Sequence, residues 1–418
     1  MITILVFAFF GLLALAIPVA HVLVISSGAA ILASQEFPVM LVAQQMVNQT
    51  LSFPMLALPF FILSGSLMMS GRLGEKLIGF ATELVQRFHG GLGSVTVLGS
   101  CVFGGVSGSA VADATALGGM LIPWQTREGY PAGFTAANNA AASSIAILIP
   151  PSIPLILYSL VSNVSVAKLF IAGVLPGLIL TIGFTLVCNL SARLRGFPLT
   201  RTPFNARKCL ALFGEALPAL VMPIMILVLM RFGFATPTEV SVIAVFYALF
   251  AGVFIYRDMT IRRFFQALLA AGVATGVVML VIMGSAVVGW MMTYAQVPQL
   301  FAQWCMTTLK EPWLIVLAMI AIMLVAGMFI DLPAAVLLLG PIFVPLAKTI
   351  HLDLTTLGLV MVLTLAIGLY TPPVGTTLFI SSSIARISIL KTTRELWPFY
   401  AVAMGNTLLF AYVPVLTL

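Results

Sequence analysis

Apolar residues run along this chain in long stretches that short polar segments separate. Stretches that contain no Asp, Glu, Lys or Arg include 37–71, 129–167 and 264–309. Each exceeds the roughly 20 residues that a helix needs to cross a bilayer. Lipid offers the backbone no hydrogen bonds, and the segments suit helices rather than barrel strands, so the pattern predicts an all-α polytopic membrane protein. The expected spans are 53–70, 132–160, 166–192, 210–230, 238–256, 264–292, 355–382 and 396–415, with 2–34 as one more stretch that bends at Pro18.

Two further segments, 91–123 and 312–345, each begin and end beside charges that we place on the same side of the membrane. Each segment is too short for two full spans but long enough for two half-spans. We therefore predict two re-entrant helical hairpins, the first entering from the cytoplasm and the second from outside. Irregular backbone at that depth is tolerated only where protein or water covers it. The expected non-helical tips are Gly104–Ser109 and Asp331–Pro333.

The two halves of the chain resemble each other. The shift that carries Gly65-Ser66 onto Gly284-Ser285 also carries Pro18 onto Pro237. Because 53–70 is predicted to run inward and 264–292 outward, the two repeats are inverted. Inverted repeats with broken helices are typical of secondary transporters, whose substrate binds near the bilayer midplane. A second, slightly longer shift, which we call the repeat shift, needs no gap to place Gly105 on Gly327, Gly118 on Gly340, Pro123 on Pro345, and Pro150-Pro151 on Pro372-Pro373.

A pair of adjacent prolines interrupts one predicted span in each repeat. Proline has no N–H and displaces the carbonyl four residues earlier, which frees the carbonyls of Ala146, Ile147, Gly368 and Leu369. Such oxygens opposite a hairpin tip favour Na⁺, whereas a kink that serves packing alone is the alternative. We predict a first cation site formed by Gly105, Ser107, Ala146, Ile149 and Ser152. The second predicted site is formed by Gly327, Gly368, Thr371 and Val374.

The composition supports a membrane protein and argues against a nucleic-acid-binding one. Charged residues make up 7% of the chain, whereas soluble domains carry about 25%. The net charge of +7 comes from cations in the loops 193–208, 257–263 and 386–394, which is the positive-inside pattern of cytoplasmic loops. The four cysteines are scattered without a CxxC pair, so we predict packing roles for them. Residues 1–34 lack the basic start and cleavage site of a removable signal peptide.

Few residues in the apolar stretches can ionise. Asp113 lies in the first hairpin, Asp331 at the second tip, and His21 is expected to be a packed polar residue. No chain of acids and histidines suggests a proton relay, which favours Na⁺ over H⁺ as the coupling ion. The chain contains no Walker A, GxSxG or HExxH signature, which argues against an enzyme.

No deep Arg or Lys awaits an anionic substrate. A carboxylate would instead meet helix N-termini and small polar side chains, although Ser and Thr also hold membrane helices together. The predicted substrate contacts are Ser109, Asn139, Ser144, Thr376 and Thr377.

Six stretches resemble the large membrane subunit, the DctM-like family, of the tripartite ATP-independent periplasmic (TRAP) transporters. With the hydropathy pattern, the resemblance covers essentially the whole chain. The chain departs from the family at Thr364 and Thr377, where the family often has Asn, so we do not transfer a substrate. The stretches are GGVSGSAVADATALGGMLIP (104–123), REGYPAGFTAA (127–137), ILIPPSIPLILY (147–158), FATPTEVSV (234–242), GMFIDLPAAVLLLGPIFVPLA (327–347) and AIGLYTPPVGTTLF (366–379).

The resemblance implies a Na⁺-coupled elevator transporter of the bacterial inner membrane. It would take up a small organic acid such as a C4-dicarboxylate, a sialic acid or another sugar acid. Its implied partners are a small four-helix membrane subunit and a soluble periplasmic substrate-binding protein. Scaffold helices would lie in 1–90 and 193–310. The moving bundle would comprise the hairpins, broken helices and last helix in 91–192 and 311–418.

Two other classes remain open from the sequence. A stand-alone cation-coupled transporter of organic anions would share the inverted-repeat architecture but need no partners. A membrane enzyme or a channel is a more distant alternative. The absence of a catalytic constellation argues against the enzyme, and two discontinuous hairpins at inverted positions argue against a simple pore.

Overall fold

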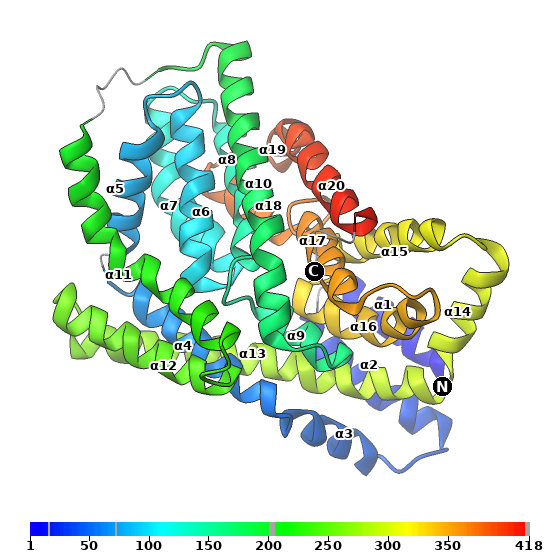
Figure 1. Cartoon of the computed structure of the whole chain (residues 1–418). Coiled ribbons are helices and arrows are strands. Elements are labelled where there is room, and N and C mark those ends of the chain that lie inside the picture. The colour runs from blue at the N-terminus through cyan, green and yellow to red at the C-terminus, as the bar shows by residue number, and fades with distance from the viewer. Residues whose placement is uncertain (16, 72, 200–204, 414–418) are drawn as a thin grey trace.

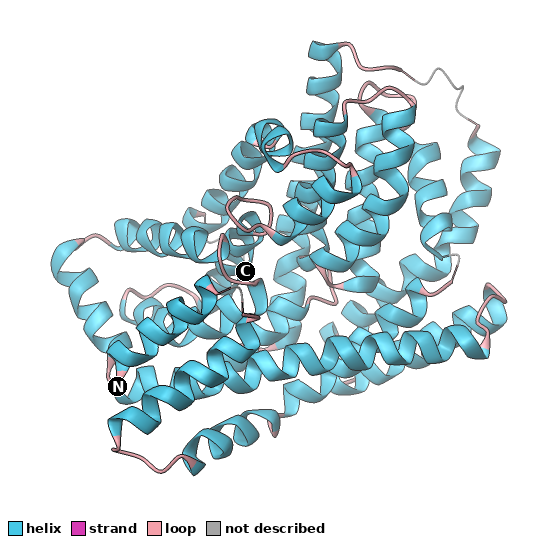
Figure 2. Cartoon of the chain, turned by 180° about the vertical axis from the view of Figure 1, so that it is seen from behind, coloured by secondary structure: helices cyan, strands magenta, loops and turns pink. Residues whose placement is uncertain are grey.

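A computed structural model describes residues 1–15, 17–71, 73–199 and 205–413 of the chain. Over these residues it contains helices and no strand (Figure 2), which confirms the all-α prediction. Residues 414 and 415 of the last predicted span lie outside the described residues. Within the described ranges, five helical stretches have the length and apolar composition to cross a membrane: Val166–Arg195, Ala206–Arg231, Pro237–Ile255, Ile261–Tyr294 and Leu332–Thr349.

Both predicted hairpins form. The first consists of α6 (Gly91–Ser107) and α7 (Ala110–Arg127), and the second of α15 (Pro312–Gly327) and α16 (Leu332–Thr349). The arms of each hairpin pack against one another.

The first tip is shorter than predicted, and the second begins and ends earlier in the chain than predicted. The chain is helical through Ser107, because Gly108 is the residue that takes the left-handed conformation (φ 60°) and ends α6. Ser109 then caps α7 by accepting a hydrogen bond from the N–H of Ala112. At the second tip only 328–331 are outside helices. Pro333 belongs to the first turn of α16, where the missing N–H is tolerated.

The proline pairs break helices as predicted. In the first repeat α8 (Ala132–Ala142) continues as a 3₁₀ turn, η2 (Ser143–Ile147), and α9 (Ile153–Ser162) begins after the break. In the second repeat α17 (Leu354–Gly368) and α18 (Thr376–Ile384) flank the other pair. The Pro150–Pro151 and Pro372–Pro373 peptide bonds are both cis.

The helix boundaries confirm the repeat. The repeat shift carries both ends of α7, Ala110 and Arg127, onto both ends of α16, Leu332 and Thr349. It also carries the start of α8 onto the start of α17. The repeats exchange their half-helices, since α18 packs against α7 and α8 while α9 packs against α16. This reciprocal arrangement places the two proline breaks between the two hairpins.

Long helices from both repeats lie along one side of the molecule (Figures 1 and 2). There α4 packs against α12 and α13, and α13 also packs against α2 and α3. The long helix α10 packs against α6 of the first hairpin and against α20. The bounds are α2 (Val19–Ser34), α3 (Met40–Thr50), α4 (Ala57–Met69), α10 (Val166–Arg195), α11 (Ala206–Arg231), α12 (Pro237–Phe250), α13 (Ile261–Tyr294) and α20 (Trp397–Tyr412), with η1 (Phe53–Leu56) before α4 and a π-helical turn, η3 (Ala251–Ile255), after α12.

Several elements differ from the prediction. Residues 2–34, for which the sequence predicted only a bend at Pro18, form two helices packed on each other, α1 (Ile2–Ala14) and α2, and α2 begins directly after Pro18. Four shorter helices were not predicted: α3, α5 (Leu73–Val85), α14 (Val297–Thr308) and α19 (Ile389–Glu395). In α5 the buried Leu77, Ile78 and Ala81 recur at helical spacing, a signal too short to count as a span.

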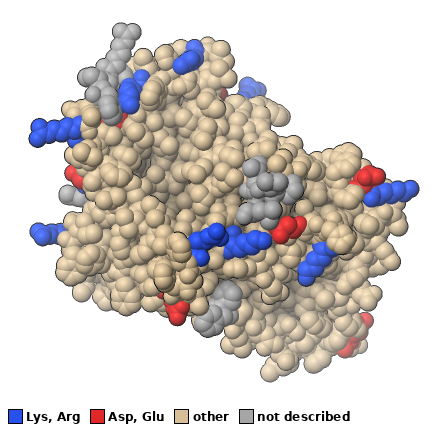
Figure 3. Space-filling view, in the orientation of Figure 1, with Lys and Arg blue, Asp and Glu red and all other residues tan. Residues whose placement is uncertain are grey.

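The ion pairs agree with the predicted threading. Arg195 and Glu395, in segments predicted to be cytoplasmic, approach within 2.5 Å, while Lys168 and Asp353, both predicted outside, lie 3.7 Å apart. Figure 3 shows charged side chains in small groups separated by broad uncharged surfaces. The uncharged surface is what a bilayer-embedded protein requires.

Candidate functional site

Each hairpin touches the proline break of its own repeat through a glycine. A Cβ placed on Gly104 would lie 2.4 Å from the Cα of Ala146. A Cβ placed on Gly368 would lie 2.4 Å from the carbonyl carbon of Gly327. Ala146 and Gly368 are equivalent under the repeat shift. No side chain fits between hairpin and break at either point, so the backbones themselves meet there.

Residues of the first predicted cation site lie around this contact. Gly108 lies so close to the break that a Cβ on it would be 2.1 Å from the carbonyl oxygen of Pro151. The Oγ of Ser107 is buried and has no hydrogen-bond partner in the described part of the chain. Gly105 faces the Cγ2 of Ile149 and the ring of Pro223. This glycine therefore borders α11 as well as the break.

The hydroxyl of Ser152 is already used within the break. It donates to the carbonyl of Ile147, one of the oxygens that the prolines were predicted to free. A carbonyl has two lone pairs, so this oxygen keeps one for a cation. Ser152 also caps α9 by accepting from the N–H of Leu155 at 3.4 Å.

At the second predicted cation site, a hydrogen bond joins the proline break to its hairpin. The N–H of Val374 donates to the carbonyl of Met328 at the hairpin tip, over 3.3 Å. The hydroxyl of Thr371 donates to Ile367 at 2.6 Å, and its N–H donates to the carbonyl of Gly368 at 3.0 Å. Two of the site's predicted oxygens, the Thr371 hydroxyl and the Gly368 carbonyl, therefore already take part in hydrogen bonds.

Some of the predicted substrate contacts have polar atoms without a hydrogen-bond partner in the described chain, and the others are already hydrogen-bonded. The Oδ1 of Asn139 and the Oγ1 of Thr376 are buried and lack hydrogen-bond partners among the described residues. Ser144 instead donates to Ala141 at 2.6 Å. Thr377 donates to the carbonyls of Ala140 (3.1 Å) and Leu369 (3.0 Å). Ser109 serves as the cap of α7.

The family model for "Tripartite ATP-independent periplasmic transporter, DctM component" matches residues 6–416. The chain belongs to this family. As a DctM component, it is similar to the uncharacterized protein y4mL of Sinorhizobium fredii, with 52% identity over 99% of both chains. It is 36% identical to the C4-dicarboxylate TRAP transporter large permease protein DctM of Pseudomonas aeruginosa (88% of this chain, 86% of that one). It is 34% identical to the sialic acid TRAP transporter large permease protein SiaM of Vibrio cholerae (99% and 96%).

The fold of this DctM component also resembles a solved structure. The YdaH transporter of Alcanivorax borkumensis superposes with a TM-score of 0.64 at 14% sequence identity. The match covers 88% of this chain and 87% of that one. At this identity the likeness concerns the fold alone.

Sequence reasoning missed several buried polar contacts of this DctM component. The amide of Asn139 donates to the Oγ of Ser381 on α18 at 2.9 Å and to the carbonyl of Ala114 on α7 at 3.0 Å. Ser381 follows Thr377 by one helical turn, so the spacing could have indicated it. Ser100 donates to one carboxylate oxygen of Asp113 at 2.7 Å. These bonds tie α6, α7, α8 and α18 together.

The structure also locates Asp331, His21 and Thr364, which the sequence analysis singled out. Asp331 is the N-cap residue of α16 and is exposed. His21 was expected to be packed, but it is exposed on α2, since the buried face of that helix contains Ala20, Val22 and Leu23. The hydroxyl of Thr364 donates to the carbonyl of Val360 at 2.7 Å, so it takes part in the helix rather than in the site.

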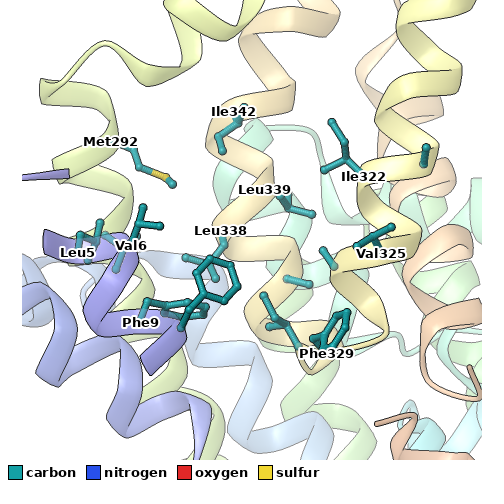
Figure 4. Close-up of a pocket in the computed structure, with 16 residues that line it drawn as sticks. Leu5, Val6, Phe9, Met292, Ile322, Val325, Phe329, Leu338, Leu339 and Ile342 are labelled. Atoms are coloured by element: carbon teal, nitrogen blue, oxygen red, sulfur yellow. The ribbon is translucent and has the colours of Figure 1, made fainter. Parts of the chain in front are cut away.

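A hollow with an entirely apolar lining lies beside the second hairpin (Figure 4). It has a volume of about 600 Å³, and its lining residues come from α1 and α13 on one side and from the second hairpin on the other. Leu5 and Phe9 face Leu338 and Phe329 across it. A charged organic acid would lose its hydration there without compensation, so this hollow is no substrate site.

Proposed function

We propose that the chain is the large permease of a Na⁺-coupled uptake system for a small organic acid. The observation that carries the proposal is that side-chain oxygens of Ser107, Asn139 and Thr376, near the two proline breaks, are buried without a hydrogen-bond partner among the described residues. Buried polar atoms without partners are rare in folded proteins and call for a missing partner. These three come from elements that the inverted repeats bring together around the predicted sites.

Na⁺ would bind at each hairpin–break contact. In the first site the Ser107 hydroxyl and the carbonyl oxygens of the break, including Pro151, are the proposed ligands. In the second site the carbonyls around Gly368 and the hydroxyl of Thr371 have the same role. No three His, Cys, Asp or Glu side chains gather into a metal site among the described residues. The proposed ligands are therefore neutral oxygens of the kind found at transporter cation sites.

The substrate carboxylate would bind between the breaks, beside the N-terminus of α18. The positive end of a helix dipole attracts an anion, and Thr376 is the first residue of α18. Asn139 and Thr376 are the proposed direct contacts, since their oxygens are not committed elsewhere. An oxygen acceptor such as Asn139 Oδ1 would take a hydrogen bond from a substrate hydroxyl or a bound water. Relatives named for C4-dicarboxylate and sialic acid support an organic acid.

We further propose that transport uses an elevator motion. The second hairpin buries only apolar residues and glycine. Its boundary with α1 and α13 contains the apolar hollow. Apolar contacts are non-directional, so this boundary can slide without breaking hydrogen bonds. In this proposal 91–192 and 311–418 move against 1–90 and 193–310.

The proposed assembly includes a small membrane subunit and a periplasmic substrate-binding protein, in the bacterial inner membrane. Membership in a tripartite family supports these partners. The alternative is a stand-alone transporter of the same fold, which would need no partners.

Reconstitution tests the proposal. The chain, its small membrane partner and its periplasmic protein are placed in proteoliposomes with a candidate acid, with and without an inward Na⁺ gradient. We expect uptake only with all three components and Na⁺. Uptake by the chain alone would favour the stand-alone transporter, and uptake driven equally well by a proton gradient would refute Na⁺ coupling.

A further inference from the structure

A hollow of about 550 Å³ lies where α7 and α18 end. Two arginines line it, Arg127 at the end of α7 and Arg386 just beyond α18, together with Thr126 and apolar side chains. Its volume falls within the range of small-molecule sites, roughly 300–1,000 Å³. The hollow is separate from the proline breaks and from the apolar cavity of Figure 4.

The two guanidinium groups lack acidic partners among the residues the structure describes. The Nε of Arg127 donates to the carbonyl of Pro123 at 3.2 Å, which leaves its terminal nitrogens available. Glu395 lies on α19, which packs against α18, but it does not line the hollow, and Arg195 contacts both of its carboxylate oxygens. Glu128 follows Arg127 in sequence but is exposed and does not line the hollow. The hollow therefore has a net positive lining.

The two helices that end at the hollow begin near the proposed substrate site. The helix α7 follows the first hairpin tip, and α18 begins at Thr376. From Thr376 to Ile384 the helix rises about 12 Å. Thr115 and Gly119 on α7 and Phe379 and Ser383 on α18 are exposed along the way. An exposed strip therefore links the breaks to the arginines, on the side that the charge pattern predicts to be cytoplasmic.

We propose that Arg127 and Arg386 form a binding site for a small oxyanion group at the cytoplasmic mouth of this strip. Guanidinium groups bind carboxylates and phosphates through paired hydrogen bonds. The group is either the carboxylate of a soluble acid or the phosphate of an anionic lipid. If the proposed function holds, the carboxylate is that of the substrate leaving the transporter, and the site assists release.

Charge-selective labelling tests the site without transport. Ala385, which also lines the hollow, is changed to cysteine in a full-length chain in which the partly exposed Cys101 and Cys209 are replaced by alanine. The rates of modification are measured with an anionic sulfonatoethyl and a cationic trimethylammonioethyl methanethiosulfonate. We expect the anionic-to-cationic ratio to fall about tenfold in Arg127→Gln/Arg386→Gln. The control, Arg193→Gln/Arg394→Gln, removes two exposed arginines that do not line the hollow.

Two protection experiments identify the source of the anion. Succinate that slows the anionic reagent in detergent, but not in the double variant, identifies a soluble carboxylate. Protection in phosphatidylglycerol nanodiscs, but not in phosphatidylcholine nanodiscs, identifies a lipid phosphate. An unchanged ratio in Arg127→Gln/Arg386→Gln, an equal fall in the control, or no protection by either anion would overturn the proposal. Labelling needs neither Na⁺ nor partner proteins, so its failure would leave the proposed function untouched.

Discussion

Gly327 and Gly368 meet backbone to backbone, with the second hairpin held directly against the second proline break. A Cβ on Gly368 would lie 2.5 Å from the carbonyl oxygen of Gly327. In the first repeat Ala146, the equivalent of Gly368, makes a similar contact with Gly104, one residue before the equivalent of Gly327. The same solution in both repeats indicates that close approach of hairpin and break is a requirement of the site rather than an accident of packing.

Substituting alanine at this contact should destabilise the fold. In Gly368→Ala the new methyl group would meet backbone atoms that cannot rotate away, and overpacking of this kind costs about 1–3 kcal/mol. We expect a lower thermal unfolding temperature in detergent and weaker Na⁺-dependent transport. Gly405→Ala is the control, because a Cβ there meets nothing within 4 Å. Equal stability of the two variants would contradict the contact.

Substitutions of the neighbouring Thr376 and Thr377 should affect different properties, one substrate binding and the other stability. Thr377→Val removes a hydroxyl that bonds to Ala140 and Leu369, so we expect a loss of about 1–3 kcal/mol in stability. Thr376→Val removes a buried hydroxyl without a partner in the described chain, so stability should be unchanged while the KM for substrate rises about tenfold. Thermal unfolding and uptake kinetics on the same preparations separate the two effects. The reverse pattern would mean that Thr377, not Thr376, contacts the substrate.

Much of this architecture could be predicted because its signals are local. Proline lacks an N–H wherever it occurs, so the two pairs identified the helix breaks directly. Segment lengths likewise identified the hairpins. The register of the first tip was not predictable, because Gly104, Gly105 and Gly108 can all adopt a positive φ. Packing of the first two against Ala146 and α11 leaves Gly108 to turn the chain.

Whether each hydroxyl is already hydrogen-bonded within the protein could not be predicted from the sequence. A serine or threonine in a helix can bond to a carbonyl one turn back or reach across to a neighbour. Ser144 takes the first course, and Ser107 takes neither among the described residues. Only the three-dimensional neighbours decide this, so the predicted site residues could be named but not sorted into open and occupied ones.

The outer end of α17 should carry a small pH dependence. Burial disfavours the charged form of Asp353, but hydrogen bonds from Thr356 and Thr355 and the Lys168 ammonium outweigh it and lower its pKa. A lowered pKa stabilises the fold above the unfolded value of about 4, and this contribution is lost as the pH falls through the folded value.

Asp353→Asn tests this contribution, since Asn retains the capping function without the charge. We expect the unfolding temperature of the variant to fall less steeply than that of the parent chain as the pH drops below about 4. Glu311→Gln, at the start of α15, is an exposed control. Parallel curves for Asp353→Asn and the parent chain would show that the carboxylate contributes nothing.

The hydroxyl of Ser152 should be structural, in contrast to that of Ser107. Ser152→Ala removes the bond to the Ile147 carbonyl and the cap of α9. A lost cap and hydrogen bond together cost about 1–3 kcal/mol, so we expect a lower unfolding temperature in detergent. Ser107→Ala removes an unpartnered group and should leave that temperature unchanged. A stable Ser152→Ala variant would show that the break does not need this bond.

Direct binding of Na⁺ tests the central claim. Equilibrium binding of ²²Na⁺ is measured for the purified parent chain, for Ser107→Ala and for Ser144→Ala. The last variant is the control, because the Ser144 hydroxyl already donates to the carbonyl of Ala141. The account predicts saturable binding that weakens about tenfold in Ser107→Ala and is unchanged in Ser144→Ala. Absence of saturable binding, or equal affinity in all three proteins, would contradict a Na⁺ site at the first proline break.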